Sequence, residues 1–337
     1  MNHKYSTILV TGGAGFIGAH LIQKLLKTYK KIICVDNFND YYDPQLKTDR
    51  LRTLAKNQNG KDWPKNFQLY KTDIKNLKAL EKIFKKEKID LICHLAAQAG
   101  VRFSLIKPFI YQRSNVLGTL NLLELAKKYQ AKNFIFASSS SVYGNNQKIP
   151  FSEIDKVNQP ASLYGATKIA GEALCYAYHS LYKIPCTCLR FFTVYGPWGR
   201  PDMAYFKFTK NILEGKPIEV YNFGKMSRDF TYIDDLVEGI LKTIKQKFAF
   251  EIINLGHNKP ISLLNFIKVI EKNTGKKAKK KGLPIQKGDI VKTWAKISKA
   301  KKLLNWEPKV SFNQGIKAFV SWYKKYYHFT HENRPTT

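Results

Sequence analysis

Residues 10–18 read Val-Thr-Gly-Gly-Ala-Gly-Phe-Ile-Gly, and they are the strongest local indication of the fold. An apolar run precedes it and an amphipathic pattern with helical spacing follows, so we expect a strand, a glycine-rich turn and a helix in direct succession. Gly12, Gly15 and Gly18 would let the backbone approach a pyrophosphate, which the positive end of the helix attracts. A glycine turn that only packs a helix on a strand is the weaker interpretation in this context. The stretch therefore predicts a dinucleotide site.

The next predicted strand ends at an acidic residue. Asp36 stands 18 residues beyond Gly18. A carboxylate there accepts hydrogen bonds from both hydroxyls of an adenosine ribose and repels a 2′-phosphate, so the sequence favours NAD over NADP. Two further strand ends fit the same ligand: Asp73 is expected to face the adenine, and the small residues of His-Leu-Ala-Ala-Gln (94–98) the pyrophosphate. We expect His94 itself to lie in the core.

Short apolar strands alternate with amphipathic helices through the first half of the chain, which is typical of a parallel sheet covered by helices on both faces. Later, glycine and proline interrupt the pattern and the elements become short. We expect an α/β fold, a Rossmann-type doubly wound parallel sheet with a smaller, interleaved C-terminal substrate-binding domain. Residues 1–190 would form the NAD-binding domain and 191–337 most of the substrate-binding domain, with a strand near 251–255 returning to the main sheet. The other strands of that sheet are expected over 7–12, 31–37, 67–73, 90–96, 133–139 and 186–191, and the first helix over 18–29.

The charge balance is unusual, because 57 Lys and Arg against 25 Asp and Glu give a formal charge of +32. Nucleic-acid binding is one interpretation, but the lysines are dispersed over predicted helix faces and no recognised nucleic-acid motif accompanies them. We expect attraction for anionic substrates and no specific nucleic-acid partner. The one dense cluster, Gly-Lys-Lys-Ala-Lys-Lys-Lys-Gly at 275–282, is expected in a loop.

Cysteine usage and hydropathy bear on location. The five cysteines are odd in number and scattered through apolar segments, which argues against a disulfide framework and for a reducing compartment. No signal peptide is recognised at the start, and the apolar runs fall short of the roughly 20 residues of a membrane helix. We expect a cytoplasmic protein without a membrane partner. No metal site is expected, since Cys186 and Cys188 have no second pair.

Tyr164 and Lys168, in Tyr-Gly-Ala-Thr-Lys, lie four residues apart at the start of a helical stretch and so share one face of it. A free tyrosine has a pKa of about 10, too high for a base at neutral pH. A nearby ammonium and a positive nicotinamide ring would favour the phenolate, so we expect a lowered pKa. Upstream, the four serines 138–141 end an apolar strand, which requires a polar ligand at that point.

These motifs follow one another as TGGAGFIG, VDN, HLAAQ, SSSSVYG and YGATK, an order that resembles the extended short-chain dehydrogenase/reductase family of nucleotide-sugar enzymes. The blocks DNFNDYYDPQLK, AAQAGVRFSL, LRFFTVYGPWGRPDMA and KPIEVYNFGKMSRDFTYIDD are similar to those of UDP-glucuronate 4-epimerases. The resemblance covers nearly the whole chain, except the tail after about residue 325. It implies an isomerase that converts UDP-glucuronate to UDP-galacturonate for polysaccharide biosynthesis, through a transient 4-keto sugar formed with NAD.

The resemblance also implies roles for the reacting groups. Tyr164 would remove the proton of the C4 hydroxyl, Ser139 would orient that hydroxyl, and Lys168 would hold the cofactor ribose and keep the tyrosine acidic. Relatives that eliminate water carry Asp-Glu at Ser140 and Ser141, and decarboxylating relatives carry Glu at Ser141, so this chain lacks the diverting acid. The residues expected to hold NAD are Gly12, Gly15, Phe16, Ile17, Gly18, Asp36, Asn37, Asp73, Ile74, Leu95, Ala96, Ala97, Asn115, Tyr164 and Lys168.

A C4 ketone beside a C5 carboxylate is a β-keto acid, which loses carbon dioxide when the carboxylate bond lies perpendicular to the carbonyl plane. We expect Arg200 and Thr193, supported by Ser141, to hold the carboxylate away from that geometry. Arg228 matches the family's phosphate-binding arginine, whereas Gln286 stands where many sugar epimerases have an arginine. We expect Arg102 to lie near the phosphates and the sugar, and Glu219 and Tyr221 to face the uracil. The full expected substrate site is Arg102, Ser139, Ser140, Ser141, Thr193, Arg200, Glu219, Tyr221, Arg228 and Gln286.

Two other functions stay open at this point. One is a 4-epimerase of a neutral UDP-hexose or its N-acetyl derivative, and the other is an NAD-sensing protein that has kept the fold and lost the chemistry. The intact Ser139, Tyr164 and Lys168 argue against the second. Because helices 116–128 and 164–182 have apolar faces that pair in this family, we also expect a homodimer.

Overall fold

The computed structural model describes residues 5–56 and 63–329. Its centre is a sheet of seven parallel strands in the order β10-β6-β5-β4-β1-β2-β3. The order reverses between β1 and β4, the position at which doubly wound sheets bind their ligands. The doubly wound parallel sheet predicted from the sequence is confirmed. Its strands are β1 (Thr7–Thr11), β2 (Lys31–Asp36), β3 (Phe67–Lys71), β4 (Leu91–His94), β5 (Asn133–Ser139), β6 (Cys186–Phe191) and β10 (Phe250–Leu255).

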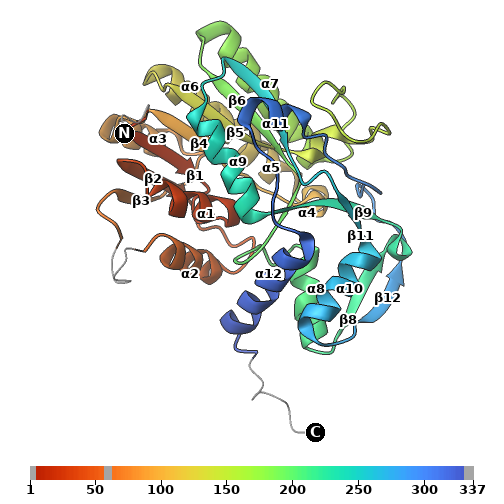
Figure 1. Ribbon diagram of the computed structural model, residues 1–337. Coiled ribbons are helices and arrows are strands. Elements are labelled where there is room, and N and C mark those ends of the chain that lie inside the picture. Colours follow the sequence, from red (N-terminus) through yellow and green to blue (C-terminus); the bar gives the residue numbers. More distant parts are fainter. Residues whose placement is uncertain (1–4, 57–62, 330–337) are drawn as a thin grey trace.

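Helices cover both faces of this sheet, and Figure 1 shows the two layers. The strands are almost continuously apolar and buried because each face carries a hydrophobic cluster. Local signals start the helices where the sequence indicates: the Ser162 side chain caps α7 by accepting from the Gly165 amide, and Asn76 caps α3 in the same way. One layer contains α1 (Phe16–Leu25), α2 (Pro44–Leu54), α9 (Ile233–Lys245) and α11 (Ser298–Leu304), and the other α3 (Leu77–Glu87), α6 (Gly118–Lys128) and α7 (Leu163–Tyr182).

The connections above the sheet are short helical turns. They are α4 (Val101–Ile106), α5 (Pro108–Tyr111), η1 (Gln112–Leu117), which leads into α6, and η2 (Ser140–Tyr143) at the end of β5. His94 at the end of β4 lies in the core, where its two ring nitrogens bond the hydroxyls of Thr11 and Thr119 at 2.8 and 3.0 Å. Burial lowers its pKa to about 3, so this histidine is neutral.

A second, smaller part packs at the carboxyl ends of the main strands. It has a three-stranded sheet and a two-stranded sheet. Aromatic rings join its elements: Phe206 of one helix packs against Phe319 of another, and Phe230 of a strand stacks on Phe266 of a helix. Its elements are β7 (Thr193–Tyr195), α8 (Ala204–Leu213), β8 (Pro217–Tyr221), η3 (Asn222–Gly224), β9 (Ser227–Tyr232), β11 (Pro260–Ser262), α10 (Leu263–Thr274), β12 (Lys279–Leu283) and α12 (Phe312–Tyr326).

The lysine cluster at 275–282 is a loop, as expected, only over residues 275–278. Residues 279–283 form β12, which pairs in parallel with β8 and exposes its three lysines. Long charged side chains suit an edge strand because they keep other chains from pairing with it. Composition alone misplaced this segment, since the pairing depends on a partner about sixty residues away.

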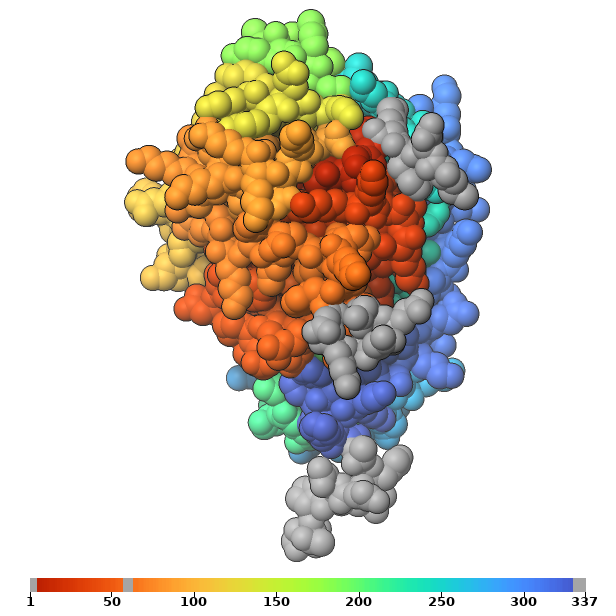
Figure 2. All heavy atoms as spheres, turned by 90° about the vertical axis from the view of Figure 1, so that its left-hand side faces the viewer, coloured from red at the N-terminus to blue at the C-terminus, as the bar shows by residue number. Residues whose placement is uncertain are grey.

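The two parts interleave along the chain. β10 pairs with β6 at the edge of the main sheet although β7, β8 and β9 precede it. At the other end, α12 lies beside α2, where the Tyr326 hydroxyl donates to Asp49 at 2.8 Å, and Figure 2 shows this blue helix against the orange residues. None of the helices in the described part of the chain is long and apolar enough to cross a membrane.

Candidate active site

A cavity of about 1020 Å³ lies at the carboxyl ends of β1, β2, β4 and β5, between the main sheet and the second part. Open sheets of this type bind ligands there, and the volume is at the upper end of single-ligand sites. The structure brings together in this cavity all of the predicted cofactor and substrate residues except Asn115 and Gln286.

The glycine turn forms a tight cradle below the cavity. Gly12 has a φ of +69°, and a Cβ there would lie 2.7 Å from the Ala96 amide nitrogen. A Cβ on Gly18 would lie 2.2 Å from the Gly12 carbonyl oxygen. Gly15 precedes α1 without a side-chain cap, so the first amides of that helix are open toward the cavity. These groups fit a pyrophosphate, which needs close backbone approach and amide donors.

Asp36 and Asp73 mark the far end of the cradle. Asp36 accepts from the amides of Ala14 at 3.0 Å and Phe38 at 2.8 Å. Burial raises the pKa of this carboxyl, and the two amides with Lys47 and Arg50 oppose the rise. Asp73 accepts from the Asn37 amide at 2.9 Å. Both carboxyls line the cavity, as the interpretation of the strand ends requires.

Tyr164, Ser139 and Lys168 converge from α7 and β5. The Lys168 ammonium is buried, donates to the Ala137 carbonyl at 2.6 Å and lies 5.9 Å from the centre of the Tyr164 ring. Burial lowers its pKa to about 8. Burial also raises the pKa of Tyr164, opposed by its hydrogen bond with Ser139 and by the charge of Arg200. The expected lowering of the tyrosine pKa is therefore wrong for the protein groups alone, since desolvation of the phenol outweighs the charges around it.

The four serines face different ways. Ser138 turns into the core and donates to Glu172 at 2.5 Å, and Glu172 is held by two hydrogen bonds from Arg190 at 2.8 and 2.9 Å. Ser139 turns to the cavity and its hydroxyl accepts from the Ser141 amide at 3.1 Å. Ser140 and Ser141 line the cavity from η2. Alternation along a strand explains the division, because neighbouring side chains point to opposite faces.

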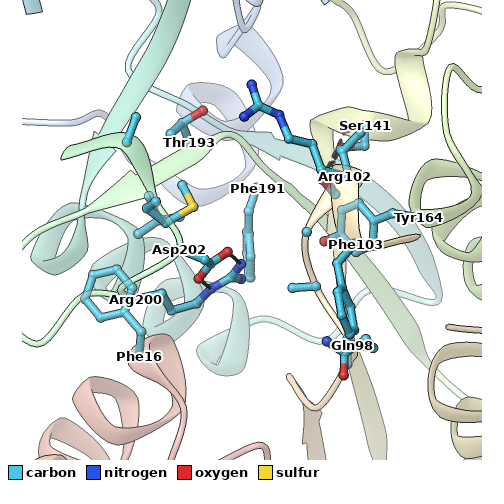
Figure 3. A pocket seen from close by; sticks show the side chains of 18 of the residues that line it. Phe16, Gln98, Arg102, Phe103, Ser141, Tyr164, Phe191, Thr193, Arg200 and Asp202 are labelled. Atoms are coloured by element: carbon cyan, nitrogen blue, oxygen red, sulfur yellow. Dashed lines mark hydrogen bonds and ion pairs between the residues drawn. The ribbon is translucent and has the colours of Figure 1, made fainter. Parts of the chain in front are cut away.

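Arg200 projects into the cavity opposite Tyr164, as Figure 3 shows. Its Nε and Nη2 donate to the two carboxylate oxygens of Asp202 at 3.0 and 2.6 Å. The Tyr41 hydroxyl donates to the same carboxylate at 3.3 Å. Thr193, at the start of β7, lies on the same side (Figure 3). The sequence indicated Arg200 and Thr193, but not the two residues that contact the arginine.

A third set of polar residues comes from the second, smaller part of the molecule and lines that side of the cavity. Arg228 is desolvated, which lowers its pKa, and its Nη1 donates to the carbonyls of Ser227 and Val291. Arg102 stacks 4.2 Å from the centre of the Tyr221 ring and pairs with Asp289 at 3.0 Å. The Tyr221 hydroxyl donates to Glu219 at 2.6 Å.

Two predicted residues lie elsewhere. Asn115 is buried behind the cavity, where its side chain accepts from the Gln98 amide at 2.7 Å and donates to the Gln98 carbonyl and to Thr167. It therefore shapes the 94–98 segment from behind instead of lining the site. Gln286 lies in the loop after β12 outside the cavity lining, whereas Asp289, three residues on, lines it. Neither residue lines the cavity, so their assignments stay predictions without support from the cavity lining.

Several lining residues were missed. Tyr41, Phe103 and Gln98 lie on the main-sheet side, and Asp202 and Asp289 on the other. Tyr41 and Asp202 belong to blocks that the resemblance already covers, which was the one signal available. No cluster of histidine, cysteine or acidic side chains among residues 5–56 and 63–329 is arranged to hold a metal ion.

Comparison with known proteins supports a common ancestry over most of the chain. The family model described as GDP-mannose 4,6 dehydratase matches residues 9–319. A UDP-glucuronate 4-epimerase of Thermodesulfobacterium geofontis is 49% identical over 318 residues, which are 94% of this chain and 96% of the relative.

Solved structures agree. The UDP-glucuronic acid 4-epimerase of Bacillus cereus, in complex with UDP-glucuronic acid and NAD, superposes with a TM-score of 0.88 at 41% identity, covering 95% of this chain and 100% of that one. The UDP-glucose 4-epimerase of Thermotoga maritima, with UDP-glucose, gives a TM-score of 0.85 at 32% identity over 95% of this chain and 99% of its own.

Proposed function

The chain belongs to the NAD-dependent epimerase/dehydratase family of extended short-chain dehydrogenases/reductases, and we propose that within it the protein interconverts UDP-glucuronate and UDP-galacturonate. The broader assignment is a nucleotide-sugar 4-epimerase. One observation supports the uronate in particular: Arg200 faces Tyr164 across the cavity, so a cation stands opposite the phenol and its serine partner.

NAD fits the cradle of Gly12, Gly15 and Gly18, and the carboxylate of Asp36 suits an adenosine ribose without a 2′-phosphate. When bound, the nicotinamide supplies an acceptor for the hydrogen of the sugar C4 and returns it later. The protein groups then have two tasks, which are to move the hydroxyl proton and to hold the sugar.

Tyr164, as phenolate, takes the proton of the C4 hydroxyl and gives it back when the ketone is reduced. Ser139, which hydrogen-bonds the phenol, orients the substrate hydroxyl. Lys168 holds the cofactor ribose from the floor of the site, where its bond to Ala137 fixes it. Because Ser140 and Ser141 are not acidic, no side chain at that strand end can protonate a leaving hydroxyl, and elimination is disfavoured.

A uronate substrate also requires that its carboxylate be held in a fixed orientation. Thr193 and Arg200, with Ser141 across the cavity, hold its carboxylate near the plane of the C4 ketone, so that the C5–carboxylate bond stays away from the geometry of decarboxylation. Arg228 and Arg102 neutralise the diphosphate, and Tyr221 with Glu219 borders the uracil. The guanidinium of Arg228 is suited to this task, since burial and the charge of Arg102 outweigh the one nearby carboxylate, Asp289, and a bound anion would stabilise it.

A neutral UDP-hexose is the second candidate, favoured by the fold similarity to a UDP-glucose 4-epimerase. UDP-glucuronate, UDP-glucose and UDP-N-acetylglucosamine should be supplied separately at equal concentration and the products resolved by NMR. We expect the glucuronate to turn over with a kcat/KM at least about 100-fold higher, in line with the loss of a charge-assisted contact of about 3 kcal/mol. A neutral sugar that turns over faster would overturn the uronate assignment but not the epimerase.

We also propose a homodimer formed by α6 and α7. Their outer faces expose Leu117, just before α6, and Leu163 and Leu181 of α7, which lie about five helical turns apart and so share one face. Exposed apolar side chains on one face favour a copy of the same surface. Light scattering should give twice the chain mass, and Leu181→Asp should halve it. The cytoplasmic location expected from the sequence stays a prediction.

A further inference from the structure

The pairing of Arg200 with Asp202 uses only part of the guanidinium. Of its five N–H groups, one on Nε and one on Nη2 point to Asp202. Of the remaining three, one on Nη1 and one on Nη2 form the adjacent, end-on edge, and the second on Nη1 points back along the side chain. Within the described ranges the guanidinium is hydrogen-bonded to Asp202 and Tyr41, and the side chain is 23% exposed. One guanidinium can therefore bridge two carboxylates, Asp202 at its side and a ligand at its end.

Tyr41 ties this pair to the other wall of the cavity. Its hydroxyl reaches Asp202 from the loop after β2, 161 residues away in the chain. The ring rests on Phe103 with 4.9 Å between centroids. Gly100, with a φ of +101°, makes room for it, since a Cβ there would lie 2.5 Å from the Tyr41 hydroxyl. The arginine is thus fixed from both parts of the molecule.

We propose, resting on the proposed function, that Asp202 and Tyr41 are positioning residues which hold the end-on edge of Arg200 toward the substrate carboxylate and so prevent decarboxylation of the 4-keto intermediate. Asp202 offsets part of the charge of Arg200, but the N–H groups on the end-on edge remain charged donors. The pair therefore restrains the carboxylate by the direction of these hydrogen bonds as well as by attraction. A free arginine would attract the carboxylate more strongly and orient it less well.

The side reaction that this arrangement prevents is a balanced one. The C5–carboxylate bond of the UDP-4-keto-uronate breaks, its electron pair forms an enolate with the C4 carbonyl, and carbon dioxide leaves. A proton from solvent then adds to C5 and gives a UDP-4-keto-pentose. The ketone itself comes from the oxidation at C4 that the proposed function already includes. Each such event yields one carbon dioxide and one ketopentose, and both can be counted.

The test compares Asp202→Asn, Tyr41→Phe and the wild type as holoenzymes supplied with UDP-glucuronate. An amide at 202 can accept from Arg200 through one atom only, so the two-bond pairing is lost. Asp40→Asn is the matched control, because Asp40 is exposed in the same loop and makes no hydrogen bond within the described part of the chain. Carbon dioxide, UDP-4-keto-pentose and UDP-galacturonate are measured per turnover, together with the affinities for UDP-glucuronate and UDP-glucose by calorimetry.

We expect Asp202→Asn to raise the ratio of carbon dioxide to UDP-galacturonate about tenfold or more, since small misplacements at a reacting centre have effects of this size. Its preference for UDP-glucuronate over UDP-glucose in binding should rise, because the charge of Arg200 is no longer partly offset. If Asp202 had a merely structural role, its replacement would lower the affinities for both UDP-glucuronate and UDP-glucose. Tyr41→Phe should shift the product ratio less in the same direction, and Asp40→Asn not at all.

An Asp202→Asn enzyme that is slower but forms only UDP-galacturonate would overturn the proposal and leave the proposed function intact. If that variant does not fold, Tyr41→Phe decides in the same way. A wild-type enzyme that fails to epimerise UDP-glucuronate would instead overturn the proposed function.

Discussion

The Lys168 ammonium lies 5.9 Å from the centre of the Tyr164 ring, and its hydrogen bond goes to the Ala137 carbonyl of β5. The lysine therefore lies below the ring without a bond to the phenol oxygen. Among the protein groups, Ser139 and Arg200 lower the pKa of Tyr164 against the effect of burial.

Ser139→Ala should make the tyrosine a poorer base at neutral pH. The hydrogen bond from Ser139 lowers the pKa of Tyr164, so its loss means that the phenolate forms only at higher pH. The acidic limb of the plot of log kcat/KM against pH should therefore move to higher pH. At neutral pH the rate should fall by about 10²-fold. A pH series on UDP-glucuronate measures both effects. Ser139→Thr keeps a hydroxyl and should restore the limb, whereas an unchanged limb in the alanine variant would rule out the contact as the cause.

Lys168→Met should abolish activity and stabilise the protein freed of dinucleotide. Burial lowers the pKa of Lys168 from 10.5 to about 8, so keeping this side chain as an ammonium at neutral pH costs the native state roughly 3 kcal/mol. The methionine variant avoids this cost but loses the hydrogen bond to Ala137, which stabilises the native state by about 1 kcal/mol. Urea unfolding at pH 7 should show a gain of about 2 kcal/mol. The gain should shrink as the pH rises above 8, because the native lysine then loses its proton first. If the wild type and Lys168→Met were equally stable at all pH values, the buried ammonium would not destabilise the native protein.

Thr193→Val and Arg200→Ala should change the product and not only the rate. Each removes a donor for the substrate carboxylate, which can then rotate toward the perpendicular geometry. Carbon dioxide release per UDP-galacturonate formed should rise about tenfold in either variant. Clean loss of activity without ketopentose, in both variants, would show that these residues do not restrain the carboxylate.

Glu172→Gln should destabilise the fold by about 3–5 kcal/mol, since it leaves the Arg190 guanidinium without its anion inside the protein. Both side chains of this pair are nearly inaccessible, and Ser138 contacts it. Chemical denaturation measures the change. Glu307→Gln breaks an exposed pair with Lys301 and should leave the midpoint unchanged. If both variants unfold at the wild-type midpoint, the buried pair does not stabilise the native state.

Much of this site could be predicted from the sequence, since the glycine turn and the serine and Tyr164 motifs are local and each lies at a strand end. The different orientations of Ser138 and Ser139 could also have been predicted, because neighbouring side chains along a strand point to opposite faces. The role of Asp202 was not accessible, because a partner two residues from Arg200 is recognised only when the turn between them is known. The contact of Tyr41 joins two distant segments, and no local pattern indicates it.

In the mechanism that we propose, one sugar carbon is oxidised and then reduced again within a single site. UDP-glucuronate labelled with deuterium at C4 tests it most directly, in ordinary water, with the product followed by NMR. We predict UDP-galacturonate that retains the deuterium at C4, because the hydrogen removed never leaves the site. Replacement of the label by solvent hydrogen would contradict this mechanism.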